Sequence, residues 1–284
     1  MALNEFSLIQ HYFSSATSKR ADVIVDIGDD CAVLACPADK HLAVSIDTLV
    51  AGTHFFHDVA PKTLGHKSLA VSLSDLAAMG AQPAWFTLAL TLPEIDEDWL
   101  KAYAEGLAEL AESHRIQLVG GDTTKGPLSI SIQVHGFVEH GKQIQRSGAK
   151  KGDKIFVTGC LGDAGAALKQ RLENWDSVDL DANDCRYLSR RLEMPTPRNS
   201  ESEQLLPFMT AAIDVSDGLL ADISHILSSS QVGADIHLAN LPLSPSLQKI
   251  DLHLAQTLAL TAGDDYELCF TVPDSMVNDL LALN

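Results

Sequence analysis

Short carboxylates recur in this sequence at positions where chemistry with metal ions and phosphate is possible. Each follows an apolar run and stands beside a glycine or a hydroxyl residue, and the groups are Asp29-Asp30, Asp47, Asp122, Asp214 with Asp217, and Asp264-Asp265. Mg²⁺ prefers hard oxygen ligands, commonly one or two carboxylates per ion together with water and substrate phosphate oxygens. The pattern therefore predicts magnesium-assisted phosphate chemistry.

Each of these aspartates also has a purely structural interpretation. A single aspartate after a strand often caps a helix or forms a turn, and that alternative stays open for every site taken alone. Five such sites in one chain favour the ligand interpretation. Asp75 differs, because Leu73, Leu76 and Ala77 surround it in the sequence. We expect it to be buried and to need a partner, which is a metal ion or a hydrogen bond.

The charge balance narrows the classes of partner. The chain has 20 Lys and Arg against 38 Asp and Glu, a formal net charge of −18, with more than twice as many aspartates as glutamates. A negative field of this size repels nucleic acid and anionic lipid, so we expect neither nucleic acid nor a membrane as a partner. A phosphate-bearing partner would need metal ions to approach.

Cysteine usage and hydropathy bear on the compartment. The five cysteines form no C-x-x-C pair, which indicates neither a disulfide framework nor a thiolate zinc site and favours the reducing cytoplasm. The N-terminus lacks the order of a signal peptide. The uncharged stretch Leu76–Pro93 carries Gly80 and Pro83 in its middle, so it predicts a helix end, a turn and a buried strand rather than a membrane span.

Familiar nucleotide and nucleophile motifs are missing. Gly65–Ser68 lacks the glycine that a P-loop places before its lysine. Gly159, Gly162 and Gly165 follow a predicted strand without the G-x-G spacing of a dinucleotide fold, which favours a packing turn over a phosphate cradle. Ser45 stands where an aspartyl phosphatase would have its nucleophile, so we expect no covalent phosphoenzyme.

The elements that must position these residues mix strands and helices. A length of 284 residues predicts two domains or one large one. Helices are expected at Leu3–Phe13, Pro61–Met79, Asp96–His114, from about Asp163, from about Asp217 and at the end of the chain. Strands are expected at His41–Asp47, Trp85–Leu92, Ile116–Val119, Leu128–Val138, Lys154–Thr158, Ala211–Val215 and Leu268–Val272. The fold class is therefore α+β or α/β. The turn Gly148–Gly152 is expected to mark the domain boundary. Asp176–Asp184 is expected to be a solvated acidic loop.

Five motifs in this order resemble the thiamine-monophosphate kinase family, within the aminoimidazole ribonucleotide synthetase-like superfamily. They are Gly28–Val33, Asp47–Phe55, Ser74–Ala81, Gly120–Thr124 and Asp214–Leu219. Their order and spacing match the family from near the first residue to Glu267, and the set is far more specific than any member of it.

The resemblance implies a fold, a reaction and partners. It implies an N-terminal domain at residues 1–148, which binds ATP and Mg²⁺ and whose mixed sheet pairs in a homodimer. It also implies a C-terminal α/β domain at residues 149–284. We expect this second domain to lack the family's last segment, which would leave the acceptor site incomplete. It implies ATP-dependent phosphorylation of thiamine monophosphate to thiamine diphosphate by direct in-line transfer with several Mg²⁺ ions, without a covalent nucleophile or a dedicated base. The alternatives are another ATP-dependent enzyme of the superfamily and a catalytically silent nucleotide-binding module.

Site residues follow by carrying the family's positions onto this sequence. The implied metal ligands are Asp30, Ser45, Ile46, Asp47, Asp75, Asp122, Asp214 and Asp217. The implied ATP contacts are Tyr103, Gly121, Asp122, Arg146 and Ser216, and the implied substrate contacts are His54 and Asp264. Many relatives have threonine where this chain has Ile46, so only its backbone carbonyl could serve there. A surface role for Arg146 and a turn role for His54 stay open.

Overall fold

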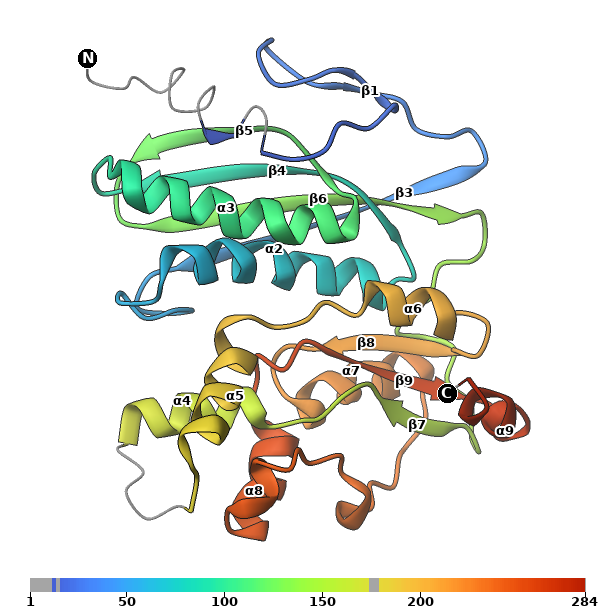
Figure 1. Ribbon diagram of the computed structural model, residues 1–284. Coiled ribbons are helices and arrows are strands. Elements are labelled where there is room, and N and C mark those ends of the chain that lie inside the picture. The colour runs from blue at the N-terminus through green and yellow to red at the C-terminus, as the bar shows by residue number, and fades with distance from the viewer. Residues whose placement is uncertain (1–11, 14–15, 174–178, 284) are drawn as a thin grey trace. The chain divides into compact units, whose positions relative to one another are not determined.

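The computed structural model describes residues 12–13, 16–173 and 179–283 and forms two compact units (Figure 1). One unit contains Met1–Leu76 and Ala81–Lys142, and the other contains Ala77–Gly80 and Gln143–Asn284. The helix expected at Leu3–Phe13 lies, except for its last two residues, outside the described part. Among the described residues, no helix is long and apolar enough to cross a membrane.

The first unit is built on a mixed sheet of four strands in the order β3-β6-β4-β5. Only β4 and β5 run parallel, because the α3 connection returns the chain in the same direction. Both α2 and α3 cover one face of this sheet (Figure 1). The elements are β1 (Val23–Val25), β2 (Val33–Leu34), β3 (Lys40–Val50), α2 (Pro61–Ala78), β4 (Gln82–Leu92), α3 (Glu97–His114), β5 (Gln117–Lys125) and β6 (Ser129–Glu139).

The boundaries of α3 follow from local capping. The Asp96 side chain accepts hydrogen bonds from the Asp98 and Trp99 backbone N–H groups, each at 3.0 Å. These bonds satisfy two of the donors that a helix start leaves unpaired. At the other end Arg115 adopts the left-handed conformation, with φ of 52°, that commonly ends helices. The helix predicted at Asp96–His114 is thereby confirmed.

Two glycines let α2 and α3 cross at backbone distance. A Cβ added to Gly65 would lie 2.1 Å from the Tyr103 carbonyl oxygen, and one added to Gly106 would lie 1.9 Å from the Lys62 carbonyl oxygen. No larger residue fits either position without moving a helix. This crossing fixes α2, which carries Asp75, against α3.

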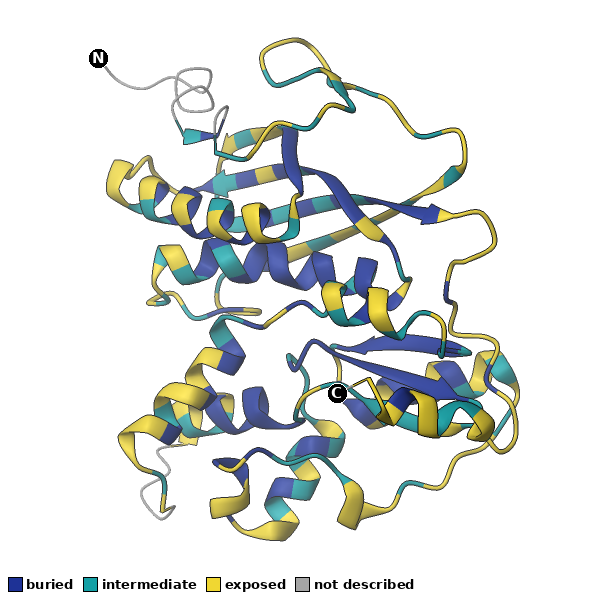
Figure 2. Cartoon of the chain, turned by 45° about the vertical axis from the view of Figure 1, so that its right-hand side comes forward, coloured by how far each residue is buried: buried dark blue, intermediate teal, exposed yellow. Residues whose placement is uncertain are grey.

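The second unit contains a sheet of three antiparallel strands in the order β7-β9-β8. Figure 2 shows β8 and β9 in the colour of buried residues, and every residue of both strands is buried. The elements are β7 (Lys154–Val157), α4 (Asp163–Glu173), α5 (Ala182–Glu193), α6 (Asn199–Leu205), β8 (Ala211–Val215), α7 (Leu219–Ser230), the 3₁₀ turns η1 (Leu238–Asn240) and η2 (Leu247–Lys249), α8 (Leu252–Thr261), β9 (Glu267–Val272), η3 (Asp274–Met276) and α9 (Val277–Leu281).

The glycine-rich turn after β7 packs against protein, as predicted. A Cβ on Gly162 would lie 2.6 Å from the Ala259 backbone nitrogen, and one on Gly165 would lie 2.2 Å from the Ala262 Cβ. The glycines are therefore needed because α8 approaches the turn closely.

The acidic stretch expected as a solvated loop was interpreted wrongly at its C-terminal end. Residues 174–178 lie outside the described part, but Asp181 caps α5 and Asp184 belongs to its first turn. Asp184 is buried because Lys249 and Ser246 donate hydrogen bonds to its carboxylate, at 2.6 and 2.8 Å. Partners more than sixty residues away remove it from solvent.

We predict that Gly106→Ala lowers the stability of the first unit by about 1–3 kcal/mol, because the added methyl group forces the helices apart. The loss outweighs the better helix propensity of alanine, which is worth about 1 kcal/mol. Urea denaturation measures the difference. The matched control is Gly233→Ala, where an added Cβ has no atom within 4 Å. Equal midpoints for the two variants would contradict the prediction.

Candidate functional site

Two aspartates of the first unit lie on the side of the sheet that α2 covers. Asp47 belongs to β3 and Asp75 to α2, and Ser45, two residues before Asp47, donates a hydrogen bond to the Asp75 carboxylate. Asp75 is only partly buried. The expectation that Asp75 is buried was therefore only partly right, and the Ser45 hydroxyl is a hydrogen-bond partner of its carboxylate.

The Asp47 carboxylate is incompletely satisfied. Its Oδ2 atom is buried and has no hydrogen-bond partner in the described part of the chain. Burial and, next, the nearby negative charge of Asp75 raise the pKa of Asp47 above its usual value. A cation would satisfy this oxygen and remove the repulsion, so these residues fit a site for a divalent ion.

Asp30 and Asp122 line a different pocket of the first unit, with a volume of about 630 Å³. Strand β5 brings Gly121 and Asp122 to it, and a Cβ on Gly121 would lie 1.9 Å from the Leu88 carbonyl oxygen. Asp30 follows the turn at Gly28, whose φ of 123° suits glycine. Both carboxylates are exposed and therefore accessible to a ligand.

Strand register places these two groups on opposite faces of the sheet. Asp122 pairs with Ala89, which pairs with Ser131, which pairs with Thr48. Paired residues point to the same face and neighbours along a strand alternate, so Asp122 shares a face with Thr48 and not with Asp47.

In the described residues, no three or more His, Cys, Asp or Glu side chains are grouped to hold a metal. A Mg²⁺ ion that is bound together with substrate phosphates typically takes only one or two carboxylates from a protein.

In the second unit, the turn after β8 is held by a residue that the sequence analysis missed. The backbone N–H groups of Ser216 and Asp217 both donate to the buried Asp222 carboxylate, at 3.0 Å each. Asp222 lies in the first turn of α7, where a carboxylate is favourable. An acid five residues after Asp217 at a helix start was the signal that could have revealed this role. Asp214 itself is buried, whereas Asp217 is exposed.

The turn at Ser216 lies against the loop Gly263–Tyr266. The Asp264 N–H donates to the Ser216 carbonyl at 2.9 Å, and a Cβ on Gly263 would lie 2.3 Å from the same oxygen. The Tyr266 hydroxyl donates to the Asp264 carboxylate at 3.0 Å. Three of the predicted positions, Ser216, Asp217 and Asp264, are thus brought together within one unit.

Two other predicted positions lie apart from these. Arg146 is exposed, and the carbonyl of the adjacent Gln145 accepts a hydrogen bond from the Ala212 N–H near the start of β8. Ser216 follows the other end of that strand. His54 is exposed and its Nδ1 accepts from the Val50 N–H at 3.1 Å, which agrees with the turn interpretation. Among the described residues of the second unit, no hydrogen bond or ion pair joins Arg146 to Ser216.

Tyr103 corrects the expected set of ATP contacts. Its side chain is fully buried, its hydroxyl pairs with Ser68 at 2.9 Å, and its ring stacks on Trp99. Burial raises the pKa of the phenol well above its usual value. In this conformation Tyr103 is a core residue of the α2–α3 crossing and has no surface with which to contact a nucleotide.

Ile46, one of the implied metal ligands, points to the exposed face of β3, opposite to Ser45 and Asp47.

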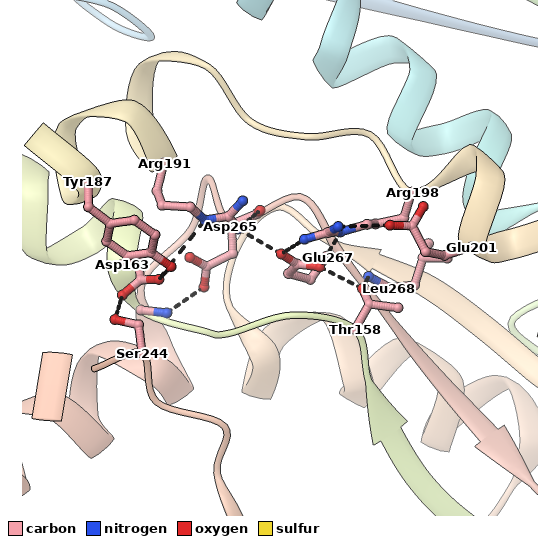
Figure 3. Close-up of polar contacts among 11 residues, drawn as sticks. Thr158, Asp163, Tyr187, Arg191, Arg198, Glu201, Ser244, Asp265, Glu267 and Leu268 are labelled. Carbon is pink, nitrogen blue, oxygen red and sulfur yellow. Dashed lines mark hydrogen bonds and ion pairs between the residues drawn. The ribbon is translucent and has the colours of Figure 1, made fainter. Parts of the chain in front are cut away.

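A buried ionic network in the second unit was also absent from the sequence analysis. Glu267 has no exposed surface and accepts hydrogen bonds from Arg191, Arg198 and Thr158 (Figure 3). Asp265 is buried beside it, and burial raises the pKa of Asp265 to about 7. Arginines are mostly surface residues, so neither composition nor spacing could single out these two.

Comparison with known proteins places the chain in a family. Family models for the AIR synthase related protein match twice, with the N-terminal domain at residues 28–138 and the C-terminal domain at residues 150–283. The thiamine-monophosphate kinase of Escherichia coli K12 is 51% identical over 278 residues, which are 96% of this chain and 84% of that protein. The chain belongs to the thiamine-monophosphate kinase family. The resemblance found in the five motifs is confirmed.

Solved structures of this family agree with the fold. The thiamine-monophosphate kinase from Stenotrophomonas maltophilia K279a is 45% identical with a TM-score of 0.88, covering 93% of this chain and 85% of that one. AaThiL complexed with AMPPCP and TMP is 32% identical with a TM-score of 0.76, covering 88% and 80%. The mixed α/β, two-domain fold expected from the sequence is therefore confirmed.

We predict that Asp47→Asn stabilises the protein in buffer containing EDTA, because the amide removes a partly buried negative charge next to Asp75. The expected gain in the free energy of unfolding is about 0.5–2 kcal/mol. Thermal or urea denaturation measures it. Asp39→Asn, which removes an exposed carboxylate just before β3, is the control and should stay within about 0.5 kcal/mol of the parent. A less stable Asp47→Asn protein would show that the carboxylate is satisfied in another way.

Proposed function

We propose that this chain transfers the γ-phosphoryl group of ATP to thiamine monophosphate, which yields thiamine diphosphate and ADP. The observation that carries the proposal is the 51% identity with a thiamine-monophosphate kinase over 96% of the chain. The presence of every implied acidic ligand supports it, because a catalytically silent module would have no reason to keep a partly buried, repelling pair of carboxylates.

The donor set fits several Mg²⁺ ions. Asp47 and Asp75, assisted by Ser45, would hold cations on one face of the first sheet, Asp30 and Asp122 would do so in the other pocket, and Asp214 and Asp217 would contribute from the second unit. When bound, magnesium would neutralise charge on the transferring phosphoryl group. The orphaned Asp47 oxygen is the structural feature that supports a cation at the first of these places.

The protein's own groups have few covalent tasks in such a reaction. An oxygen of the acceptor phosphate attacks the γ-phosphorus while the bond to the ADP oxygen breaks, and the acceptor needs no dedicated base because a phosphate monoester is largely ionised at pH 7. Gly121 would contact the nucleotide through the β5 backbone, and the Ser216 turn presents a hydroxyl. Arg146 would supply a cation with bidentate geometry. Asp264 and His54 would face the acceptor.

A homodimer through the N-terminal sheet is part of the proposal. The face of β3 opposite to Asp47 exposes 45% of Leu42, 53% of Val44 and 62% of Ile46. A contiguous apolar row of this kind is unfavourable in water and suits a protein interface. We assign residues 1–148 to ATP binding, magnesium binding and dimerisation, and residues 149–284 to a C-terminal α/β domain. The five free cysteines are compatible with a reducing, cytoplasmic location.

The proposed activity predicts thiamine diphosphate and ADP in equal amounts when the protein is incubated with Mg²⁺, ATP and thiamine monophosphate. Asp122→Asn should lower turnover more than about tenfold, which corresponds to roughly 1.4 kcal/mol of transition-state stabilisation. Chromatographic quantification of thiamine diphosphate measures both. Asp39→Asn is the matched control and should keep the parent rate. Absence of product from the parent protein, with turnover on another phosphate acceptor, would favour a different member of the superfamily.

Nucleotide binding should depend on divalent metal. Without it, the triphosphate meets an uncompensated group of carboxylates on a protein of net charge −18. We expect isothermal titration with a non-hydrolysable ATP analogue to show binding in Mg²⁺ and at least tenfold weaker binding in EDTA. Equal affinity in both buffers would exclude the metal-bridged mode of binding.

A further inference from the structure

The loop Gly263–Tyr266, which we call the acceptor loop, has a conformation that needs external support. Asp264 and Tyr266 both have positive φ angles, of 67° and 50°, although neither is glycine. Such backbone conformations are uncommon for residues with a Cβ and persist only where the surroundings impose them. The loop also carries Asp264, to which the proposed function assigns contact with the acceptor.

One side of the loop is held by the backbone of β8 and the turn after it. The Asp264 N–H donates to the Ser216 carbonyl at 2.9 Å, and the Tyr266 N–H donates to the Val215 carbonyl at 2.8 Å. These bonds set the spacing between the two loops. They leave the remaining carbonyl and carboxylate groups of the acceptor loop to other partners.

The other side is held by α5 and the glycine turn. Arg191 donates from Nη2 to the Asp265 carbonyl oxygen at 3.0 Å and to Glu267 Oε1 at 2.7 Å. The Gly162 N–H donates to Asp265 Oδ2 at 2.7 Å. Figure 3 shows Arg191 between Asp265 and Glu267. One guanidinium therefore connects the backbone of the loop with the first residue of β9.

The negative charge of Glu267 is compensated by a second arginine besides Arg191. Arg198 contacts the same carboxylate through two nitrogens, Nε to Oε2 and Nη2 to Oε1, each at 2.6 Å. Thr158 adds a third donor at 2.6 Å. Of the two arginines, only Arg191 has a hydrogen bond to the acceptor loop among the contacts described. A buried ion pair alone is weak evidence that a residue stabilises the fold. The hydrogen bond to the loop is therefore the feature that distinguishes Arg191 from Arg198.

We propose that Arg191 is a positioning residue that holds the acceptor loop, and with it Asp264, in the conformation that receives the phosphate-bearing acceptor. This inference rests on the proposed function for its kinetic consequence, but not for its structural one. The glycine turn at Gly162 has the complementary task of fixing the Asp265 side chain.

The matched pair of variants is Arg191→Met and Arg198→Met. Each removes one arginine from Glu267 and replaces it with an unbranched apolar side chain, but only the first removes the bond to the loop. We expect Arg191→Met to raise the KM for thiamine monophosphate at least tenfold and to change the KM for ATP less than threefold. Arg198→Met should leave both KM values within threefold, even if it lowers thermal stability.

Amide hydrogen exchange gives a readout that does not depend on activity. The Asp264 and Tyr266 amides should exchange at least tenfold faster in Arg191→Met than in the parent protein, and at the parent rate in Arg198→Met. Arg191→Lys, which keeps a donor but not the fork, should fall between Arg191→Met and the parent, and it serves as the test if Arg191→Met does not fold.

The outcomes separate the two proposals. Faster loop exchange in Arg191→Met alone, with a selective rise of the acceptor KM, supports the inference. Equal effects of the two arginine variants on loop exchange, or equal rises in both KM values, would show that the network is only structural and would overturn it. If the parent protein forms no thiamine diphosphate, the proposed function fails, and loop exchange still decides the role of Arg191.

Discussion

Repulsion between two partly buried carboxylates is the constraint around which the first unit is organised. Asp47 and Asp75 come from different elements and raise the cost of folding by their proximity, so the elements that carry them must be held firmly. Strand β3 is held by an eleven-residue antiparallel ladder with β6, and α2 is held by its backbone-level crossing with α3. Rigid support of this kind would keep the proposed cation site in shape instead of letting the two carboxylates move apart.

In the second unit, buried carboxylates are stabilised by hydrogen bonds from the protein. Asp222 is buried, but it accepts from the Ser216 and Asp217 amides and thereby shapes the turn that presents them. Glu267 is buried, but two arginines surround it. In both cases a carboxylate with no direct part in the proposed chemistry determines where its neighbours lie. Supporting hydrogen bonds of this kind are common around metal sites, where they orient the residues that bind the ion.

Local signals in the sequence were enough to predict most elements and the family. Pro61 and Asp96 stand at the starts of helices that the structure confirms, and alternation identified β3 and β6. Local signals failed where a distant partner decides the outcome. Asp184 was assigned to a solvated loop because Lys249 lies far along the chain. Tyr103 was expected at the nucleotide because the family's position was carried over to it, and the sequence does not reveal that the Ser68 side of α2 packs against it. The division of the aspartates between two faces depends on the β4–β5 register, which shifts at Phe86 and Thr87.

Strand β3 carries two surfaces on alternating residues: Ser45 and Asp47 on one side, and Leu42, Val44 and Ile46 on the other. Because the side-chain period of a strand is two residues, inserting or deleting a single residue within β3 would exchange the two sets over part of its length. The carboxylate would then face solvent, and an isoleucine would lie against α2. The proposed cation site and the exposed apolar face are therefore encoded by one stretch of chain, so an insertion or deletion in one affects the other. Descendants of this sequence can change β3 by substitution within either set, but a change in its length by one residue would damage both surfaces in a single event.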